Sequence, residues 1–283
     1  MNIGLVLSGG MAKGAYQIGA LKAIADLIPL SEIKYISCAS VGVLNGYAYA
    51  TNKLDQAEIM WKNVCSGDTR VIISQILKSS LLQQDIKNLF AGNDKLTSVF
   101  YASLLDITHK NIVYKNLTSV DNSKISLYLK ASVAMPVYNR AVLIDGVSYF
   151  DGAMIDNIPV FPLLKHNLDY VLCIYFDDVY YKFENAYLDN KIIKITFPCK
   201  SFLKQSVVMQ RDSIEHMIKS GYGRTIDILD SVLKNGYEDL NYIYKATECR
   251  NHNEIRSLRI TGDVLVTNLN KVVQRFAKRK IIV

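Results

Sequence analysis

The sequence predicts one α/β domain with a mainly helical C-terminal portion, on three observations. Its first fifty residues alternate short apolar runs with segments of helical periodicity. The chain has 283 residues, of which 50% are hydrophobic and 21% charged, so it is long enough and apolar enough for one large core. Residues 202–232 have mostly helical spacing, which places the helical portion after the α/β part.

The first fifty residues predict strand, turn, helix, strand, turn and helix in that order. Residues 2–7 are a short apolar run typical of a buried parallel strand, and a glycine-rich turn follows. Residues 12–28 carry apolar or small side chains at steps of four and three, as on one face of a helix, and Pro29 ends that helix. Residues 35–39 predict a second strand and residues 41–49 a second helix. This order contains a βαβ unit with a right-handed crossover.

The later elements follow from the same periodicities. We expect helices at 54–64 and 81–90, strands or strand-helix edges at 99–106, 111–116 and 126–131, a strand at 170–176, and a hairpin at 142–150. The hairpin is indicated by the Asp145-Gly146 pair, a favoured two-residue turn. Residues 66–80 have no clear pattern.

The charge balance bears on partners and localisation. The formal net charge is +7, and residues 271–280 contain five basic side chains and no acidic one. This tail is either the solvated face of a terminal helix or a contact with a membrane surface. Nucleic acid is disfavoured as a partner because no recognised binding motif accompanies the charge. No run reaches the roughly 18 to 20 apolar residues of a membrane span.

The cysteines and the N-terminus predict a cytoplasmic protein. Five cysteines are scattered without C-x-x-C spacing, which indicates neither a disulfide framework nor a zinc site. The N-terminal apolar run is short and has no basic segment before it, so it predicts a strand and not a signal peptide.

The stretch S-C-A-S-V-G-V-L-N-G, residues 37–46, nearly matches the nucleophile elbow G-x-S-x-G. Ser40 occupies the serine position and Gly42 the second glycine, while Cys38 stands where the first glycine is expected. The elbow requires a strand before the serine and a helix after it, and both are predicted here. An ordinary small-residue turn is the alternative.

The stretch L-S-G-G-M-A-K-G, residues 7–14, places exposed backbone N–H groups at the start of a helix. Its glycines fit neither the dinucleotide pattern G-x-G-x-x-G nor the phosphate loop G-x-x-x-x-G-K-[ST]. Such a turn binds negative charge, which in acyl transfer is the oxyanion of a tetrahedral intermediate. Lys13 opposes the helix dipole and is tolerable there if solvent or an anion is near. The alternative is a glycine turn that fits tightly under another strand.

Asp151, in Y-F-D-G-A-M-I-D-N-I-P-V at residues 149–160, ends an apolar run and precedes two small residues. An aspartate in this context faces a site or bonds its own backbone in a turn. Histidine is the usual base for a serine nucleophile, but none of the four histidines stands in a glycine-rich or strand-end context. An aspartate partner for the serine therefore stays open.

Taken together, these stretches and A-S-V-A-M-P-V-Y at residues 131–138 resemble the patatin-like phospholipase family. The motifs occur in the family's order over residues 1 to 165, and none is diagnostic after 180. The resemblance implies a layered α/β/α sandwich with a mainly parallel sheet over residues 1–283, with a motif core at 1–180 and a helical extension at 200–283. It also implies lipid acyl hydrolase activity through a Ser-Asp dyad, with no catalytic histidine, metal or other cofactor.

The resemblance assigns roles to residues of this chain. Ser40 matches the nucleophile and Asp151 the partner that accepts its proton. The other positions are the oxyanion loop of Gly9, Gly10 and Met11 with Lys13 in its basic position, the elbow support Gly42, and the supports of the aspartate turn Gly152, Asn157 and Pro159.

Three departures from the family pattern bear on activity. Met11 replaces a glycine, at a cost of about 1 to 2 kcal/mol if that position needs positive φ, and its side chain narrows the pocket. Cys38 adds bulk beside the turn, and Ala153 replaces the second glycine of D-G-G. The alternatives to a hydrolase are a lipid-binding or regulatory protein on the same scaffold and an acyltransferase that uses the same residues. A lipid or ester is the expected partner, with peripheral membrane contact through the basic tail.

Overall fold

The protein is described from a computed structural model, which defines residues 1–63, 71–72, 80–90, 94–136, 138–177, 180–183, 186–197, 208–209, 211–253 and 256–259. The strands of the main sheet are β1 (Ile3–Leu7), β2 (Ile33–Ala39), β4 (Val99–Asp106), β5 (Asn111–Asn116), β6 (Val142–Ile144), β7 (Val147–Asp151), β8 (Tyr170–Tyr175) and β10 (Ile192–Thr196). Two short pairings join β3 (Val71–Ile72) to β11 (Val208–Met209) and β9 (Tyr180–Phe183) to β12 (Arg256–Arg259). The helices are α1 (Gly14–Leu27), α2 (Val41–Ala50), α3 (Leu54–Asn63), α5 (Ser80–Leu89), α6 (Asn122–Ser132), α7 (Ala186–Asp189), α9 (Arg211–Val232) and α10 (Leu240–Asn253).

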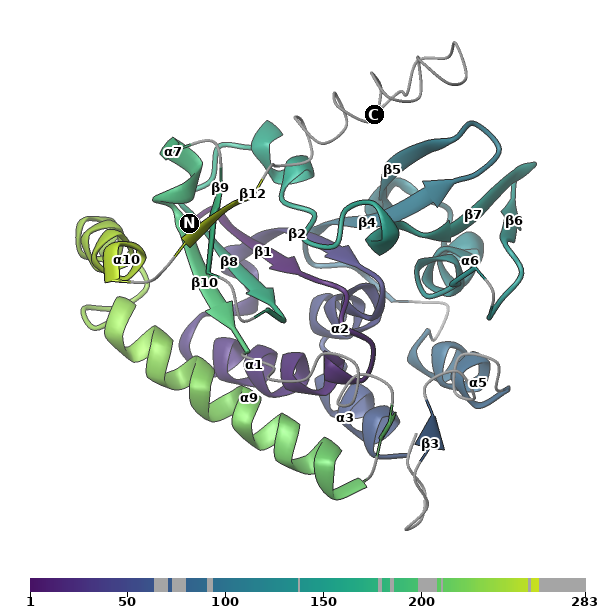
Figure 1. Ribbon diagram of the computed structural model, residues 1–283, viewed down its shortest axis with the longest axis horizontal. Coiled ribbons are helices and arrows are strands. Elements are labelled where there is room, and N and C mark those ends of the chain that lie inside the picture. Colours follow the sequence, from purple (N-terminus) through teal and green to yellow (C-terminus); the bar gives the residue numbers. More distant parts are fainter. Residues whose placement is uncertain are drawn as a thin grey trace.

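The central sheet has eight strands and is mixed. Its order is β10-β8-β1-β2-β4-β7-β6, with β5 also paired to β4 (Figure 1). The strands from β10 to β4 are parallel, whereas β5 and β7 run antiparallel to β4 and β6 runs antiparallel to β7. The predicted α/β class is confirmed, and so is the hairpin, whose Asp145 and Gly146 have φ values of 50° and 79°.

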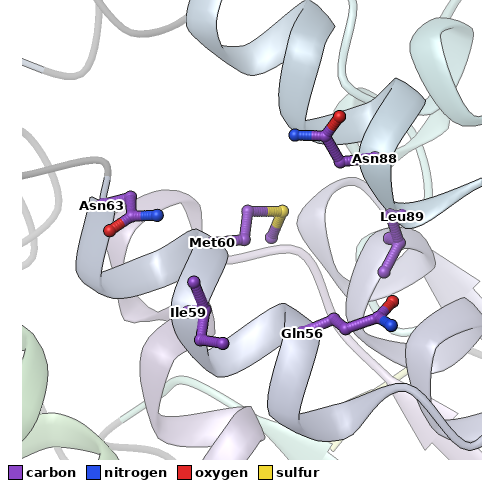
Figure 2. A pocket seen from close by; sticks show the side chains of 6 residues that line it. All are labelled: Gln56, Ile59, Met60, Asn63, Asn88 and Leu89. Carbon is purple, nitrogen blue, oxygen red and sulfur yellow. The ribbon is translucent and has the colours of Figure 1, made fainter.

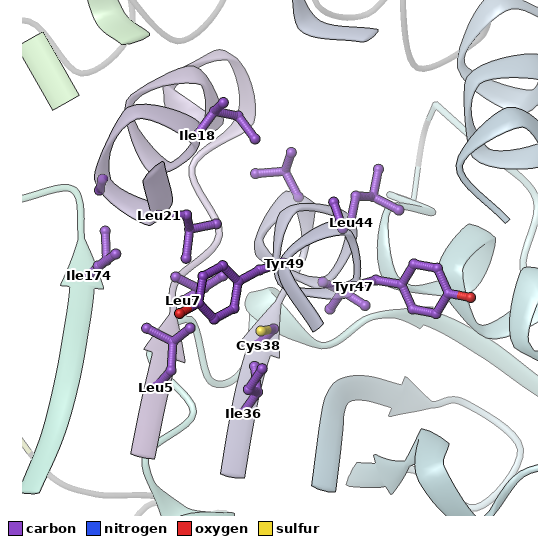
Figure 3. Close-up of a cluster of buried hydrophobic side chains, with 14 of the residues drawn as sticks. Leu5, Leu7, Ile18, Leu21, Ile36, Cys38, Leu44, Tyr47, Tyr49 and Ile174 are labelled. Atoms are coloured by element: carbon purple, nitrogen blue, oxygen red, sulfur yellow. The ribbon is translucent and has the colours of Figure 1, made fainter. Parts of the chain in front are cut away.

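Alternate side chains of the parallel strands enter two apolar clusters, one on each face of the sheet. Leu5 and Leu7 of β1 lie in the larger cluster, which α1 and α2 cover (Figure 3). Val6 between them belongs to the second cluster, with Ile158 and Leu163 of the chain that follows β7. Since side chains alternate along a strand, a buried parallel strand needs apolar residues on both faces.

The C-terminal helix α9 packs along α1, as Figure 1 shows. Gly19 of α1 and Gly221 of α9 lie at this contact. A Cβ at Gly19 would lie 1.9 Å from the Ile218 carbonyl oxygen, and one at Gly221 would lie 2.1 Å from that of Tyr16. The two backbones therefore touch without an intervening layer of side chains.

One prediction of secondary structure needs correction, and one strand of the main sheet was missed. Residues 126–131 belong to helix α6. The buried positions of this helix are Ile125, Tyr128, Leu129 and Ser132, and their helical spacing is visible only when residues on both sides of 126–131 are included. Strand β10 was not predicted at all, because Lys194 interrupts its apolar run; that lysine is buried and ion-paired.

Two predictions concern parts of the chain that lie outside the described residues. These are the basic tail at 271–280 and most of the unassigned stretch at 66–80. Within the part of the chain that the structure defines, no helix has the length and apolarity needed to span a membrane.

Candidate active site

Ser40 and Asp151 lie close together because β2 and β7 pair with successive parts of the same edge of β4. β2 pairs with the first part of β4, where Ala39 lies opposite Ser103. β7 pairs with the next part, where Asp151 lies opposite Leu104. The C-terminal ends of β2 and β7 are therefore adjacent, and Ser40, which follows Ala39, lies beside Asp151.

Ser40 has the strained backbone of a nucleophile elbow. Its φ of 53° and ψ of −133° lie in a region that L-residues rarely adopt, at a cost on the order of 1 to 3 kcal/mol. It is the N-cap of α2, so its Oγ lies at the positive end of the helix dipole. A Cβ at Gly42 would lie 2.7 Å from the Leu7 carbonyl oxygen and 2.8 Å from that of Ser8. Only glycine at this position lets α2 start so close to β1.

Asp151 is buried, with 1% of its surface exposed, at the end of β7. Burial raises the pKa of its carboxyl to about 7, against hydrogen bonds from the Ser40 hydroxyl and the Ala153 N–H that lower it. The Ala153 N–H lies 2.9 Å from Oδ1. Asp151 thus bonds its own turn and also lines the same cavity as Ser40, so the two alternatives from the sequence do not exclude each other.

The glycine loop lies against both of these residues. A Cβ at Gly9 would lie 2.8 Å from the Ser40 Cβ and 2.4 Å from the Asn157 Oδ1, so the loop backbone is in close contact with the site. The Gly9 N–H donates to the Asn157 carbonyl oxygen at 3.3 Å and the Lys13 N–H to that of Gly10 at 3.0 Å. Of the three N–H groups that the resemblance assigns to the oxyanion loop, that of Gly9 is engaged, and those of Gly10 and Met11 are the candidate oxyanion donors.

The three residues that support the aspartate turn also contact other parts of the site region, namely the glycine loop, β2 and β4. Asn157 Nδ2 donates to the Gly9 carbonyl oxygen at 3.3 Å, so Asn157 bonds the glycine loop in both directions. The Pro159 carbonyl accepts from Ser37 Oγ of β2 at 2.6 Å. Gly152 is needed for close approach to β4, because a Cβ there would lie 2.4 Å from the Ser103 carbonyl carbon.

The three departures from the family pattern have different structural consequences. Met11 has a φ of 50°, so the position does favour glycine and the methionine is strained. Cys38 and Ala153 are not among the described residues with positive φ. The Cys38 side chain points into the core, as Figure 3 shows, where Gly46 makes room for its sulfur. Burial raises the pKa of the Cys38 thiol, which disfavours its thiolate.

Lys13 and the histidines lie outside the pocket. The Lys13 side chain is fully buried at the N-cap of α1, so the solvent expected beside it is absent. His109 bonds Asp106 at 2.8 Å and His166 bonds Tyr101 at 3.0 Å. No group of three or more His, Cys, Asp or Glu side chains in the described ranges is arranged to share a metal ion.

A cavity of about 250 Å³ opens over the Ser40 hydroxyl and has a largely apolar wall. Its lining residues are Gly9, Gly10, Met11, Ser40, Met135, Asp151, Ala153, Met154 and Asn157. Met135 and Met154 were not predicted as site residues, although both stand inside the quoted motifs. Their place within these motifs, with Met154 close after Asp151, was the available signal.

A second cavity, of about 190 Å³, lies between α3 and α5. Figure 2 shows its lining residues, Gln56, Ile59, Met60, Asn63, Asn88 and Leu89. It contains none of the predicted site residues and none of the groups that act as acids or nucleophiles. Of these two cavities, the one that contains Ser40 and Asp151 is the candidate site.

Comparison with solved structures finds similar folds at low identity. The crystal structure of VipD from Legionella pneumophila matches with a TM-score of 0.52 at 12% identity, over 99% of this chain and 81% of VipD. The type III effector ExoU matches at 13% identity and a TM-score of 0.43, over 98% of this chain and 63% of ExoU. The structure of Pseudomonas aeruginosa ExoU with SpcU matches at 13% identity and a TM-score of 0.41, over 81% of this chain and 52% of that chain. At such identities the likeness to VipD shows the fold alone.

Comparison at the level of sequence gives the family. A search of curated proteins found no match. The family model described as patatin-like phospholipase matches residues 5–164, which is more than half of the chain and includes the glycine loop, Ser40 and Asp151. The chain belongs to the patatin-like phospholipase family.

Proposed function

We propose that this protein is a serine acyl hydrolase that cleaves the acyl esters of lipids. Family membership supports lipid hydrolase activity in general. The observation that carries the finer proposal is the position of the Ser40 hydroxyl beside the buried Asp151 carboxyl, in the wall of an apolar cavity that both residues line. A serine nucleophile needs an adjacent base, and in this site that base is a carboxylate.

In the proposed reaction, Ser40 Oγ attacks the ester carbonyl and Asp151 accepts its proton. The N–H groups of Gly10 and Met11 stabilise the oxyanion that forms. Asp151 then returns the proton to the leaving alcohol, and an acyl-enzyme is left on Ser40. A water molecule, deprotonated by Asp151, hydrolyses this ester and releases the fatty acid, which restores the free serine.

The environment of Asp151 supports its role as the base. An ordinary carboxylate is a weak base at neutral pH, whereas a group with a pKa of about 7 is matched to that pH. The raised pKa comes from burial, which in this site is provided by the same elements that hold Ser40. The strained elbow fixes the Ser40 hydroxyl toward this base.

The wall of the cavity supports an acyl chain as the group bound. Met11, Met135 and Met154 contribute flexible, polarisable side chains, which adapt to an apolar ligand. Met154 is 51% exposed, so the apolar wall continues to the surface of the molecule. A long-chain ester could therefore enter from a lipid aggregate with its chain against these side chains.

The test compares Ser40→Ala with wild type in the release of fatty acid from phospholipid vesicles and of p-nitrophenol from a short ester. We expect Ser40→Ala to remove the activity toward both substrates. Ser132→Ala is the matched control, because Ser132 is also a buried serine but bonds the Leu129 carbonyl within α6. Hydrolysis that persists in Ser40→Ala at the wild-type rate would refute the proposal.

A lipid-binding protein without turnover is the second candidate, and Met11 is the observation that favours it. Met11 adopts a strained backbone and lines the cavity where the oxyanion would form. A fluorophosphonate probe separates the two candidates, because it labels only a serine that can attack. Labelling at Ser40 supports the hydrolase, whereas vesicle binding without labelling supports the lipid-binding protein.

A further inference from the structure

A chain of buried side-chain hydrogen bonds runs behind the glycine loop, outside the cavity. Gln17 of α1 donates from Nε2 to the Ser8 carbonyl oxygen at 2.7 Å. Asn45 of α2 donates from Nδ2 to Gln17 Oε1 at 2.8 Å and to the Gly14 carbonyl oxygen at 2.9 Å. Trp61 of α3 donates from Nε1 to Asn45 Oδ1 at 2.9 Å. This series of hydrogen bonds thus joins the three helices α1, α2 and α3.

These bonds hold both ends of the glycine loop. Ser8 immediately precedes Gly9, and its carbonyl is bonded by Gln17. Gly14 immediately follows Lys13, and its carbonyl is bonded by Asn45. Because Gln17 and Asn45 also bond each other, the two ends of the loop are tied through side chains as well as through the backbone.

The hydrogen bonds leave little freedom in how the two amides are oriented. Ser8 and Gly14 present carbonyl oxygens and Trp61 presents an N–H, so Asn45 must point its nitrogen at the loop and its oxygen at the indole. Gln17 and Asn45 are both fully buried. An unbonded buried amide costs free energy, so a complete network selects one arrangement of the three helices.

Asn45 links this network to the nucleophile. It lies on α2, the helix that Ser40 caps, slightly more than one turn after the serine. Gly42, between them, packs its backbone against the Ser8 carbonyl. The helix that carries Ser40 and the loop that carries the candidate oxyanion donors are therefore bonded to each other away from the substrate.

We infer that Gln17 and Asn45 are positioning residues that hold the N–H groups of the glycine loop in register with Ser40 Oγ. This inference rests on the proposed hydrolase function. An oxyanion donor acts only when it is aligned with the atom that develops charge, and a misplacement of about 1 Å can lower the rate by roughly 100-fold. Met11 adds a reason for such a support, because its strained φ would otherwise drive the loop to another conformation.

The test is Gln17→Met, an unbranched substitution of similar length that removes the bond to Ser8. We expect kcat to fall by roughly 100-fold with KM changed less than about threefold, since Gln17 does not line the cavity. Fluorophosphonate labelling of Ser40 should slow by a similar factor. The matched control is Tyr47→Phe, which removes a partly buried bond from the same helix α2 to Asp94, at 2.8 Å, directed away from the loop.

Hydrogen exchange gives a readout that does not depend on turnover. The amides of residues 9–13 should exchange faster in Gln17→Met and at the wild-type rate in Tyr47→Phe. Asn45→Leu tests the same link from α2 if Gln17→Met fails to fold. The inference is overturned if the variant retains kcat within twofold of Tyr47→Phe, or if loop exchange is unchanged. If wild type shows no Ser40-dependent hydrolysis, the proposed function fails, and the exchange comparison still decides whether Gln17 holds the loop.

Discussion

Two buried aspartates, Asp151 at the end of β7 and Asp189 at the end of α7, are almost equally withdrawn from solvent. Their exposed fractions are 1% and 2%. Asp189 accepts from Lys194 Nζ at 2.7 Å and from the Phe183 N–H at 3.0 Å. In the part of the chain that the structure defines, no ion pair reaches Asp151, which accepts from Ser40 and the Ala153 N–H.

The difference teaches which buried carboxylate holds the fold and which can exchange a proton. Lys194 also bonds Asn251 of α10 at 3.1 Å and lies 5.3 Å from the centre of the Tyr180 ring, so the Asp189 pair joins β10, α7, β9 and α10. Removal of either partner would leave the other charge buried without its counter-ion. An unpaired carboxylate costs stability when it is charged, which is tolerated at a site that uses it.

The largest expected effect is the loss of activity in Asp151→Asn. We expect kcat/KM for ester hydrolysis to fall by roughly 1000-fold, because the amide cannot accept the proton of Ser40. Steady-state kinetics on the short ester measure this. Asp189→Asn serves as the matched control and should keep kcat/KM within about threefold while it loses stability. A fall of less than tenfold in Asp151→Asn would exclude Asp151 as the base.

The next effect is on stability, in Lys194→Met. We expect the free energy of unfolding to fall by about 3 to 5 kcal/mol, because the substitution leaves Asp189 buried without its cation. Urea denaturation measures the loss. The double variant Lys194→Met with Asp189→Leu should recover part of it, since both charges are then gone. A double variant less stable than either single one would contradict this view of the pair.

The third prediction concerns the pH dependence of stability and activity. The pKa of Asp151 is raised to about 7 in the folded protein, above its unfolded value, so the folded state binds the proton more tightly. The stability contributed by this proton is complete near pH 4 and is lost as the pH rises to 8, by up to roughly 4 kcal/mol.

The measurement is the free energy of unfolding of wild type minus that of Asp151→Asn at several pH values. We expect the difference to become less favourable to wild type as the pH rises from 4 to 8, because the asparagine binds no proton. In the same range kcat/KM of wild type should rise with a midpoint near pH 7. If the difference in the free energy of unfolding does not change between pH 4 and pH 8, the pKa of Asp151 is not raised.

The smallest effect is expected for Met11→Gly. Removing the strained φ gains about 1 to 2 kcal/mol, and the greater freedom of glycine in the unfolded chain takes back about 0.4 to 1 kcal/mol. The free energy of unfolding should therefore rise by up to about 1 kcal/mol, measured by urea denaturation. Met154→Gly, which also lines the cavity but has no positive φ, should lower it. Equal losses in both variants would contradict the strain at Met11.

The candidate site residues could be predicted from the sequence because each stands in a motif with its own backbone requirement. Ser40 is flanked by small residues, Asp151 ends an apolar run, and the glycine loop opens a helix. The resemblance to a family joined these three motifs, and the family match supports that step.

Features that depend on register or on distant partners were not predictable. The meeting of β2 and β7 on one edge of β4 follows from strand pairing, which no local pattern encodes. The reciprocal bonds between Asn157 and Gly9 join residues far apart in the chain. Strand β10 was not predicted because a lysine in an apolar run indicates an exposed position. Only the structure shows that Lys194 is buried and paired with Asp189.

The contact between Gly19 and Gly221 has a consequence for the order of folding during synthesis. Helix α1 is synthesised before α9, and the surface around Gly19 is covered only once α9 has also been made. Contacts between such distant segments form late, because a long loop must close first. The helix that begins at the glycine loop therefore packs against α9 later in synthesis than against α2 and α3.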